Sequence, residues 1–269
     1  MLIATTVFSA DRYVGRDLLY FWDFESKNNW TIDKKLGAEA FTSGKIRWVP
    51  PHVSFQDPES GVIHLHGDKN TTTFFLIPAK YTADKDFSEW TVDFEFAMGS
   101  HPLDNEDHGD LNVGKIFDGV VLEWGDLTVF YMEAGDPWRG TVIVEYRQRA
   151  MRIPNVPAFD YNHLVIRSEK RGVSIWVNTQ CVQYINTPTT SMKSKPIKFA
   201  SDGYAGRLDD IKIYNTRLKP WEITFNYWGT ELRLSLIHIS EPTRRYAIAY
   251  AVVVLKKKKW GGGGGGGGG

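Results

Sequence analysis

The chain has 269 residues, and its 32 basic and 32 acidic side chains give a formal net charge of zero at pH 7. Nucleic-acid and anionic-membrane partners both require a clustered basic face, so this balance argues against them. Cys181 is the only cysteine, which excludes an intrachain disulfide.

The first ten residues are apolar, end at a small residue and contain neither lysine nor arginine. Two interpretations stay open for them: a shortened signal peptide, or a strand whose upstream sequence is missing. The glycosylation triplets that begin at Asn29 and Asn70 would suit a secreted protein. We therefore treat residues 1–17 as an N-terminal segment apart from the folded domain.

From residue 18 onward, short β-branched and aromatic runs alternate with turn residues. Along residues 89–96, Trp90 and every second residue after it are apolar, while the residues between them are polar. This alternation predicts a strand with one core face and one solvent-exposed face. Further strands are predicted at residues 18–25, 62–66, 71–77, 118–124, 127–133, 141–149, 163–168, 173–177, 181–185, 197–200 and 206–215.

No amphipathic helical stretch of 12 residues separates these strands; only a stop and a single helical turn are predicted, at residues 218–223. Many short strands without crossover helices indicate an all-β fold, an antiparallel sandwich of two sheets. A domain of about 230 residues is an ordinary size for one such unit.

Four segments resemble the laminin-G-like, concanavalin A-like family of sandwich domains. Residues 18–25 are similar to its first strand, residues 89–96 to an inner strand and residues 163–178 to a hairpin, although Thr179 stands where the family has glycine. Residues 206–215, with a glycine, paired aspartates and a final Tyr-Asn, resemble its closing strand. The resemblance implies a jelly-roll domain over residues 18–228, with the last strand beside the first. It also implies an extracellular or cell-surface module of a larger protein.

Residues 229–233 are treated as a linker. Residues 234–269 resemble the translation of sequencing reads, with a transposon-type adapter first, then a poly-A run at 256–259 and a poly-G run at 261–269. We interpret this tail as an artefact and exclude it. The alternative is a genuine tail, whose apolar segment 246–255 falls short of the roughly 20 residues needed to cross a bilayer. Removing the tail's six basic and one acidic residues leaves 26 and 31, a net charge of −5.

Glycoside hydrolases share this fold, and their retaining members place two carboxylates on one strand face through a Glu-x-Asp-x-Glu pattern. Here the corresponding residues are Thr91, Asp93 and Glu95, so the first carboxylate is missing. We therefore expect no catalytic residues and interpret Asp93 and Glu95 as a solvated strand face.

The candidate ligand-binding residues lie between residues 118 and 139. Asp118, followed by Gly119, is similar to the sugar-contacting Asp-Gly of L-type lectins. Aromatic rings stack on the C–H faces of sugars, while carboxylates and guanidinium groups hydrogen-bond to hydroxyls. The expected binding residues are Asp118, Trp124, Tyr131, Asp136, Trp138 and Arg139, with the alternative that Trp124 and Tyr131 belong to the core and that Trp138 caps a loop.

The expected function is a non-catalytic glycan- or ligand-binding module. The first alternative is a structural or adhesion domain that contacts protein and has no sugar site, and a glycoside hydrolase ranks third. Oxygen ligands for calcium are expected in the acidic loop at Asp104, Asp107 and Asp110. His64 and His66 share one strand face and could contribute to a metal site, but a polar solvent-facing strand explains them more simply.

Overall fold

The computed structural model describes residues 17–24, 28–49, 62–66, 73–99, 118–136, 138–201 and 203–227. Contacts divide the chain into a unit of Met1–Tyr227 and a unit of Trp228–Gly269, and the second unit lies outside the described residues. The linker and the suspected artefact therefore also lie outside them. Among the described helices, none has the length and apolar character needed to span a membrane.

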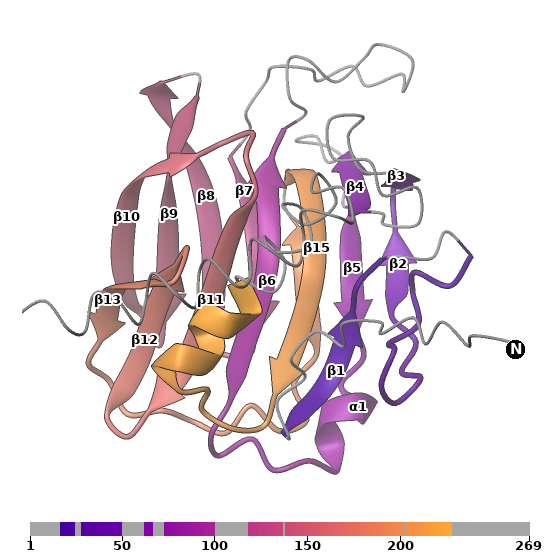
Figure 1. Cartoon of the computed structure of the whole chain (residues 1–269), viewed down its shortest axis with the longest axis vertical. Coiled ribbons are helices and arrows are strands. Elements are labelled where there is room, and N and C mark those ends of the chain that lie inside the picture. Colours follow the sequence, from indigo (N-terminus) through magenta and orange to yellow (C-terminus); the bar gives the residue numbers. More distant parts are fainter. Residues whose placement is uncertain are drawn as a thin grey trace, which may run out of the picture. The chain divides into compact units, whose positions relative to one another are not determined.

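The described residues form two antiparallel sheets that pack face to face, which confirms the predicted two-sheet sandwich (Figure 1). In spatial order, the seven-stranded sheet contains β10 (Arg149–Pro157), β9 (Arg139–Tyr146), β8 (Leu127–Asp136), β7 (Gly119–Trp124), β14 (Ile197–Ser201), β5 (Phe74–Ile77) and β2 (Phe41–Ser43). The eight-stranded sheet contains β13 (Gln180–Ile185), β12 (Gly172–Val177), β11 (Asn162–Glu169), β6 (Thr91–Met98), β15 (Ala205–Tyr214), β4 (Val62–His66) and β3 (Ile46–Val49), with β1 (Leu18–Trp22) paired to β15. A short helix, α1 (Lys80–Ala83), lies between β5 and β6 in the chain.

The closing strand β15 organises the eight-stranded sheet. It pairs with β6 along one edge, and its other edge is shared by β4 and β1. Leu18 lies opposite Tyr214, and Trp22 lies opposite Ile211. The expectation that the last strand lies beside the first is therefore confirmed.

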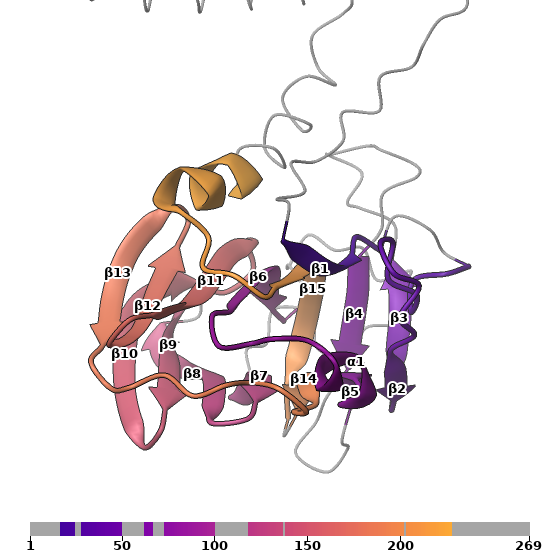
Figure 2. The same ribbon diagram turned by 90° about the horizontal axis from the view of Figure 1, so that it is seen from below.

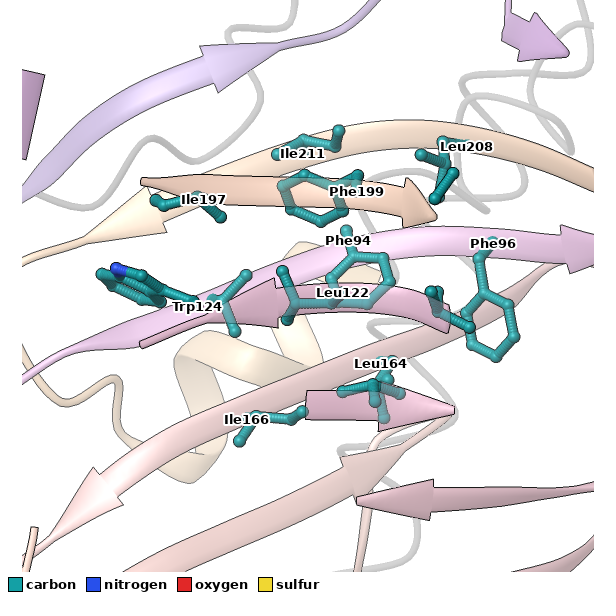
Figure 3. Close-up of a cluster of buried hydrophobic side chains, with 14 of the residues drawn as sticks. Phe94, Phe96, Leu122, Trp124, Leu164, Ile166, Ile197, Phe199, Leu208 and Ile211 are labelled. Carbon is teal, nitrogen blue, oxygen red and sulfur yellow. The ribbon is translucent and has the colours of Figure 1, made fainter. Parts of the chain in front are cut away.

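Aromatic and aliphatic side chains from both sheets fill the space between them (Figure 3). Phe94 of β6 meets Phe199 of β14 edge-on, with ring centroids 5.2 Å apart. Trp90, Val92, Phe94 and Phe96 are all buried, as the alternation along β6 predicts. Burial of these large rings supplies the main favourable free energy of folding.

The opposite face of β6 differs from the prediction of a solvated surface. Thr91 and Asp93 are fully buried, and Glu95 is only 8% exposed. Asp93 lies beneath a helix at residues 220–227 that crosses the outer side of the eight-stranded sheet (Figure 2), and its carboxylate accepts a hydrogen bond from Asn226 of that helix. The Thr91 hydroxyl donates to the backbone oxygen of Thr216, just before the helix. The predicted single turn is thus an eight-residue helix, and it adds a third layer to the sandwich.

The sequence explains why this helix forms. Pro220 occupies its first position, where the missing N–H costs nothing. The Glu222 carboxylate accepts a hydrogen bond from the backbone N–H of Lys219 at 2.6 Å, which is half of a capping box. Leu218 and Ile223 are buried in a separate apolar cluster against the outer face of the sheet. Amphipathicity therefore fixes which side of the helix faces the sheet.

The β12–β13 hairpin keeps its two-residue turn despite the departure at Thr179. Asn178 and Thr179 both have positive φ, at 47° and 72°. A β-branched residue rarely adopts this conformation, so Thr179 carries local strain that glycine would avoid. Backbone and side-chain hydrogen bonds between Asn178 and His163 hold the turn against the neighbouring strand.

Candidate ligand-binding site

The structure divides the six predicted binding residues between the core and the surface. Trp124 lies at the far end of β7 from Asp118, and it is completely buried. Its ring contacts Phe87 and Trp90, with centroids 5.3 and 5.4 Å away. Trp124 therefore takes the alternative role left open by the sequence, because its ring presents no face to a ligand in solvent.

Tyr131 is also fully buried, below the β8–β9 hairpin. Its hydroxyl donates a hydrogen bond to the backbone oxygen of Val156 at 3.2 Å. Burial, and then the charge of Asp136, raise the pKa of Tyr131 well above its ordinary value. A Cβ atom at Gly140 would lie 2.4 Å from the Tyr131 ring, so glycine is needed there. Tyr131 thus supports the hairpin from inside.

Asp136, Trp138 and Arg139 are exposed at the tip of this hairpin. The Asp136 carboxylate accepts a hydrogen bond from the backbone N–H of Trp138 at 2.8 Å. The Arg139 guanidinium donates to the backbone oxygen of Asn155 at 3.1 Å, which ties the tip to β10. The structure therefore brings these three predicted residues together on the surface.

Asp118 joins the same end of the sheet. It is exposed, directly precedes β7, and accepts a hydrogen bond from the backbone N–H of Glu133 at 2.7 Å. Glu133 pairs with Gly140 across the hairpin, so Asp118 lies one strand away from the residues at the tip. Carboxylates at this edge accept hydrogen bonds and suit a ligand rich in hydroxyl groups.

Trp138 has the most accessible ring of the predicted set. The residue is 55% exposed, and its indole contacts the buried ring of Phe159 edge-on, with centroids 5.5 Å apart. Its backbone oxygen accepts a hydrogen bond from Ala158 at 2.9 Å. A large aromatic surface held in this way can bury the C–H face of a ligand without first being ordered.

Sequence reasoning missed a second exposed aromatic area, on the outer face of the seven-stranded sheet. Phe41 is 60% exposed, and its ring lies 6.3 Å from that of Phe74. The Lys198 ammonium lies 5.4 Å above the Phe74 ring and 3.2 Å from the Glu123 carboxylate. The helix at 220–227 lies on the other sheet (Figure 2).

It also missed a buried polar network beneath the helix. The Asp93 carboxylate lies 2.8 Å from His163 Nε2 and accepts a hydrogen bond from the Asn226 amide at 2.7 Å. The same amide donates to the Tyr214 hydroxyl at 2.9 Å. Burial raises the pKa of Asp93, but attraction to His163 and Lys212 and these hydrogen bonds outweigh it, so the pKa is lowered. Asp93 is therefore a structural anchor for the helix.

The metal predictions have a different outcome. Asp104, Asp107 and Asp110 lie outside the described residues. His64 is only 7% exposed, so the solvent-facing interpretation of its strand was wrong. Within the described part of the chain, no group of three or more His, Cys, Asp or Glu side chains is arranged to hold a metal ion.

No family model and no curated protein matches this chain. Among solved structures, domain 4 of AbnA, an extracellular GH43 arabinanase from Geobacillus stearothermophilus in complex with arabinotriose, is 11% identical with a TM-score of 0.52, over 78% of this chain and 98% of that domain. A structure of botulinum neurotoxin type C, whose cell entry depends on two ganglioside molecules, is 10% identical with a TM-score of 0.52, over 80% of this chain and 52% of that one. The binding domain of botulinum neurotoxin DC in complex with rat synaptotagmin II is 11% identical with a TM-score of 0.51, over 79% and 52%. The chain spans about half the length of the two toxin structures, and at these identities the likeness concerns the fold.

Proposed function

We propose that this chain is a non-catalytic glycan-binding module of the laminin-G-like, concanavalin A-like type, acting outside the cell or at its surface. The observation that carries the proposal is Trp138, a 55% exposed residue at a sheet end whose backbone N–H donates to Asp136 and whose indole packs against Phe159. The binding surface consists of Trp138, Asp118, Asp136 and Arg139. Trp124 and Tyr131 support it from the core.

The chemistry of this surface suits a sugar. The indole provides an apolar plane for C–H groups, and the carboxylates of Asp118 and Asp136 accept hydrogen bonds from hydroxyl groups. The Arg139 guanidinium presents further donors in a rigid fork. Asp93, the central residue of the incomplete hydrolase pattern, is completely buried and accepts a hydrogen bond from Asn226 of the helix.

The structural neighbours support the proposal by analogy. The arabinanase domain is described in complex with arabinotriose, and the type C toxin is described as depending on gangliosides. These are properties of those proteins, on a similar fold. They make arabinotriose and ganglioside oligosaccharides sensible first probes.

The test is calorimetric titration with arabinotriose and a panel of other oligosaccharides. We expect Trp138→Ala to weaken binding about tenfold or more, because aromatic anchors at binding surfaces commonly contribute over 1 kcal/mol. Tyr184→Ala is the matched control, since Tyr184 is 41% exposed on β13, in the other sheet. Absence of binding to every glycan tested, or equal affinity of the two variants, would count against the proposal.

Calcium at Asp104, Asp107 and Asp110 remains part of the proposal. Calcium is usually bound by carboxylate and carbonyl oxygens, which this acidic sequence offers. The same titrations repeated in EDTA test it. Weaker glycan binding that calcium restores supports the ion, and unchanged binding excludes a role for it in ligand affinity.

A protein-contacting adhesion domain is the second candidate. The observation that favours it is a set of exposed apolar side chains close together in the chain: Phe41, Leu36 and Ile32 are 60%, 54% and 39% exposed. Exposed apolar patches commonly mark protein contacts. Under this alternative, Phe41→Ser abolishes partner binding and Trp138→Ala does not.

A further inference from the structure

The Trp138 backbone is fixed by two neighbours that are distant from each other in the chain. Its N–H donates to the Asp136 carboxylate within the hairpin, at 2.8 Å. Its carbonyl oxygen accepts a hydrogen bond from Ala158, which follows β10, at 2.9 Å. These two contacts fix the direction in which the indole leaves the backbone.

The Trp138 side chain has one further support, the ring of Phe159. Phe159 is only 5% exposed and meets the indole at 80° with centroids 5.5 Å apart. Edge-to-face pairs of this kind are stabilising beyond their buried area. The contact therefore limits the rotamers of an otherwise exposed side chain.

Residues 158–161 connect β10 of one sheet to β11 of the other, and both sheets hold them in place. The Phe159 carbonyl oxygen accepts a hydrogen bond from Arg207 of β15 at 2.6 Å, and the Ala158 carbonyl oxygen accepts one from Met98 of β6 at 2.6 Å. Asn162 donates to the carbonyl oxygens of Pro157 and Asp160. The support under Trp138 is consequently anchored to the middle of the eight-stranded sheet.

We propose that Phe159 is a positioning residue of the glycan site: it holds the Trp138 indole in the orientation that receives the sugar, without touching the sugar itself. This inference rests on the proposed function. A binding ring that is ordered in advance avoids the entropy cost of being ordered by the ligand. Loss of the support therefore weakens binding while leaving the contacting residues unchanged.

The experiment compares Phe159→Leu, which keeps an apolar side chain but removes the ring, with Phe159→Tyr, which keeps the ring. The first readout is affinity for arabinotriose, or for the tightest oligosaccharide of the titrations above. Immobilising one rotamer-rich side chain corresponds to about a 2- to 10-fold change in affinity, so Phe159→Leu is expected to weaken binding by that factor. Phe159→Tyr is expected to retain most of the affinity of the unsubstituted chain. Tyr184→Leu, at an exposed ring on β13 in the other sheet, is the control and leaves affinity unchanged.

The second readout separates positioning from general damage. In protein labelled with 5-fluorotryptophan, the ¹⁹F resonance of Trp138 is assigned from its loss in Trp138→Phe. We expect this resonance to shift and sharpen in Phe159→Leu, because the ring gains freedom, while the resonances of the other tryptophans and the unfolding temperature stay close to those of the unsubstituted chain. A Phe159→Leu variant that disturbs every resonance would mean that Phe159 serves the core alone, which overturns the inference.

The two proposals fail in different ways. Normal affinity and an unchanged Trp138 resonance in Phe159→Leu, together with lost affinity in Trp138→Ala, overturn the positioning role and leave the glycan site standing. If the unsubstituted chain binds no glycan, the proposed function fails, and the ¹⁹F comparison still decides whether Phe159 orients Trp138.

Discussion

Asp93 is the residue whose surroundings differ most from those of an ordinary strand aspartate. It is completely buried, yet its carboxylate is engaged by His163, by the Asn226 amide and by the nearby charge of Lys212. Lys212 is itself buried and lies 3.4 Å from the Asp210 carboxylate. A buried charge is tolerated only when it is paired and hydrogen-bonded, and this network satisfies that condition.

We expect Asp93→Asn to destabilise the fold by about 3 to 5 kcal/mol, because it removes one partner from a buried ionic network and leaves the others uncompensated. Chemical denaturation monitored by circular dichroism measures the change. Glu39→Gln is the matched control, since Glu39 is exposed and surface substitutions usually change stability by no more than about 0.5 kcal/mol. Equal stability of the two variants would show that Asp93 is not an anchor.

Because the pKa of Asp93 is lowered, the difference in stability between the unsubstituted chain and Asp93→Asn depends on pH. The unfolded chain binds a proton at Asp93 near the ordinary pKa of 3.8, and the folded chain binds it only at lower pH. The stabilisation by Asp93 is therefore complete above that value and is lost as the pH falls through the folded-state pKa. Denaturation at pH 7 and pH 3 should accordingly show a smaller gap between the unsubstituted chain and Asp93→Asn at the lower pH.

The tryptophans show how far the site could be predicted residue by residue. Trp124 ends β7, in which every residue except Glu123 is buried, so the continuous apolar run before it, rather than an alternation, indicates its core role. Trp138 follows the strand and directly precedes Arg139, which made its exposure predictable. The contact between Trp138 and Phe159 could not be predicted, because no local sequence signal links the tip of the β8–β9 hairpin to the residues that connect β10 to β11.

At the scale of elements, the helix at 220–227 turns a two-layer sandwich into a partly three-layered one. It contributes Ile223 to the apolar cluster with Leu18, Phe21 and Val165 of the sheet, and Asn226 to the polar network. A short isolated helix is unstable in water, so its stability depends on these tertiary contacts. The helix is therefore expected to detach as a unit before the sheets unfold.

We expect Asn226→Ala to promote this detachment, because it removes the hydrogen bonds that tie the helix to Asp93 and Tyr214. The free energy needed to detach the helix should fall by about 1 to 3 kcal/mol. Hydrogen exchange followed by mass spectrometry should show faster exchange in peptides that cover residues 220–227, with little change in β7, β8 and β9. Thr224→Ala is the control, because the hydrogen bond that its hydroxyl donates to the Pro220 carbonyl oxygen lies within the helix itself. Uniformly faster exchange across both sheets would instead mean that the helix has no independent opening.

The same helix explains which part of β6 could be predicted from sequence. The apolar residues of the strand were assigned to the core correctly, because alternation is a local signal. The polar residues were assigned to solvent incorrectly, because their partners are distant in the chain: Asp93 is bonded by Asn226, 133 residues away, and Thr91 by Thr216 and Leu218. Polar residues at alternate positions indicate only that the face is not part of the main core.

At the scale of the whole molecule, β15 holds together segments from opposite ends of the domain. The glycine, paired aspartates and Tyr-Asn ending of this strand identified it from sequence, and the resemblance correctly implied its place beside β1. The resemblance did not show that β4 shares the same edge, or that the Arg207 side chain reaches the support of Trp138. Those features depend on register, which the sequence motif does not encode.

Gly206 is the position at which this central strand tolerates no side chain. A Cβ atom there would lie 2.2 Å from the backbone oxygen of Ala97, so Gly206→Ala must push β15 away from β6. Overpacking of this kind costs about 1 to 3 kcal/mol, and more where backbone must move. We expect a cost at the upper end of that range, because the strand pairs with three others and the displacement also moves Arg207 of the Trp138 support.

Thermal unfolding followed in parallel by far-ultraviolet and near-ultraviolet circular dichroism tests this expectation. Both signals should shift to lower temperature together in Gly206→Ala, since the damage lies at a strand shared by the whole sheet. Gly37→Ala provides the comparison: its Cβ would meet no atom within 4 Å, so it carries only the strain of its φ of 67°, about 1 kcal/mol. A Gly206→Ala shift no larger than that of Gly37→Ala would mean that β15 can move without cost, and the close packing of β15 against β6 would then not be a determinant of the fold.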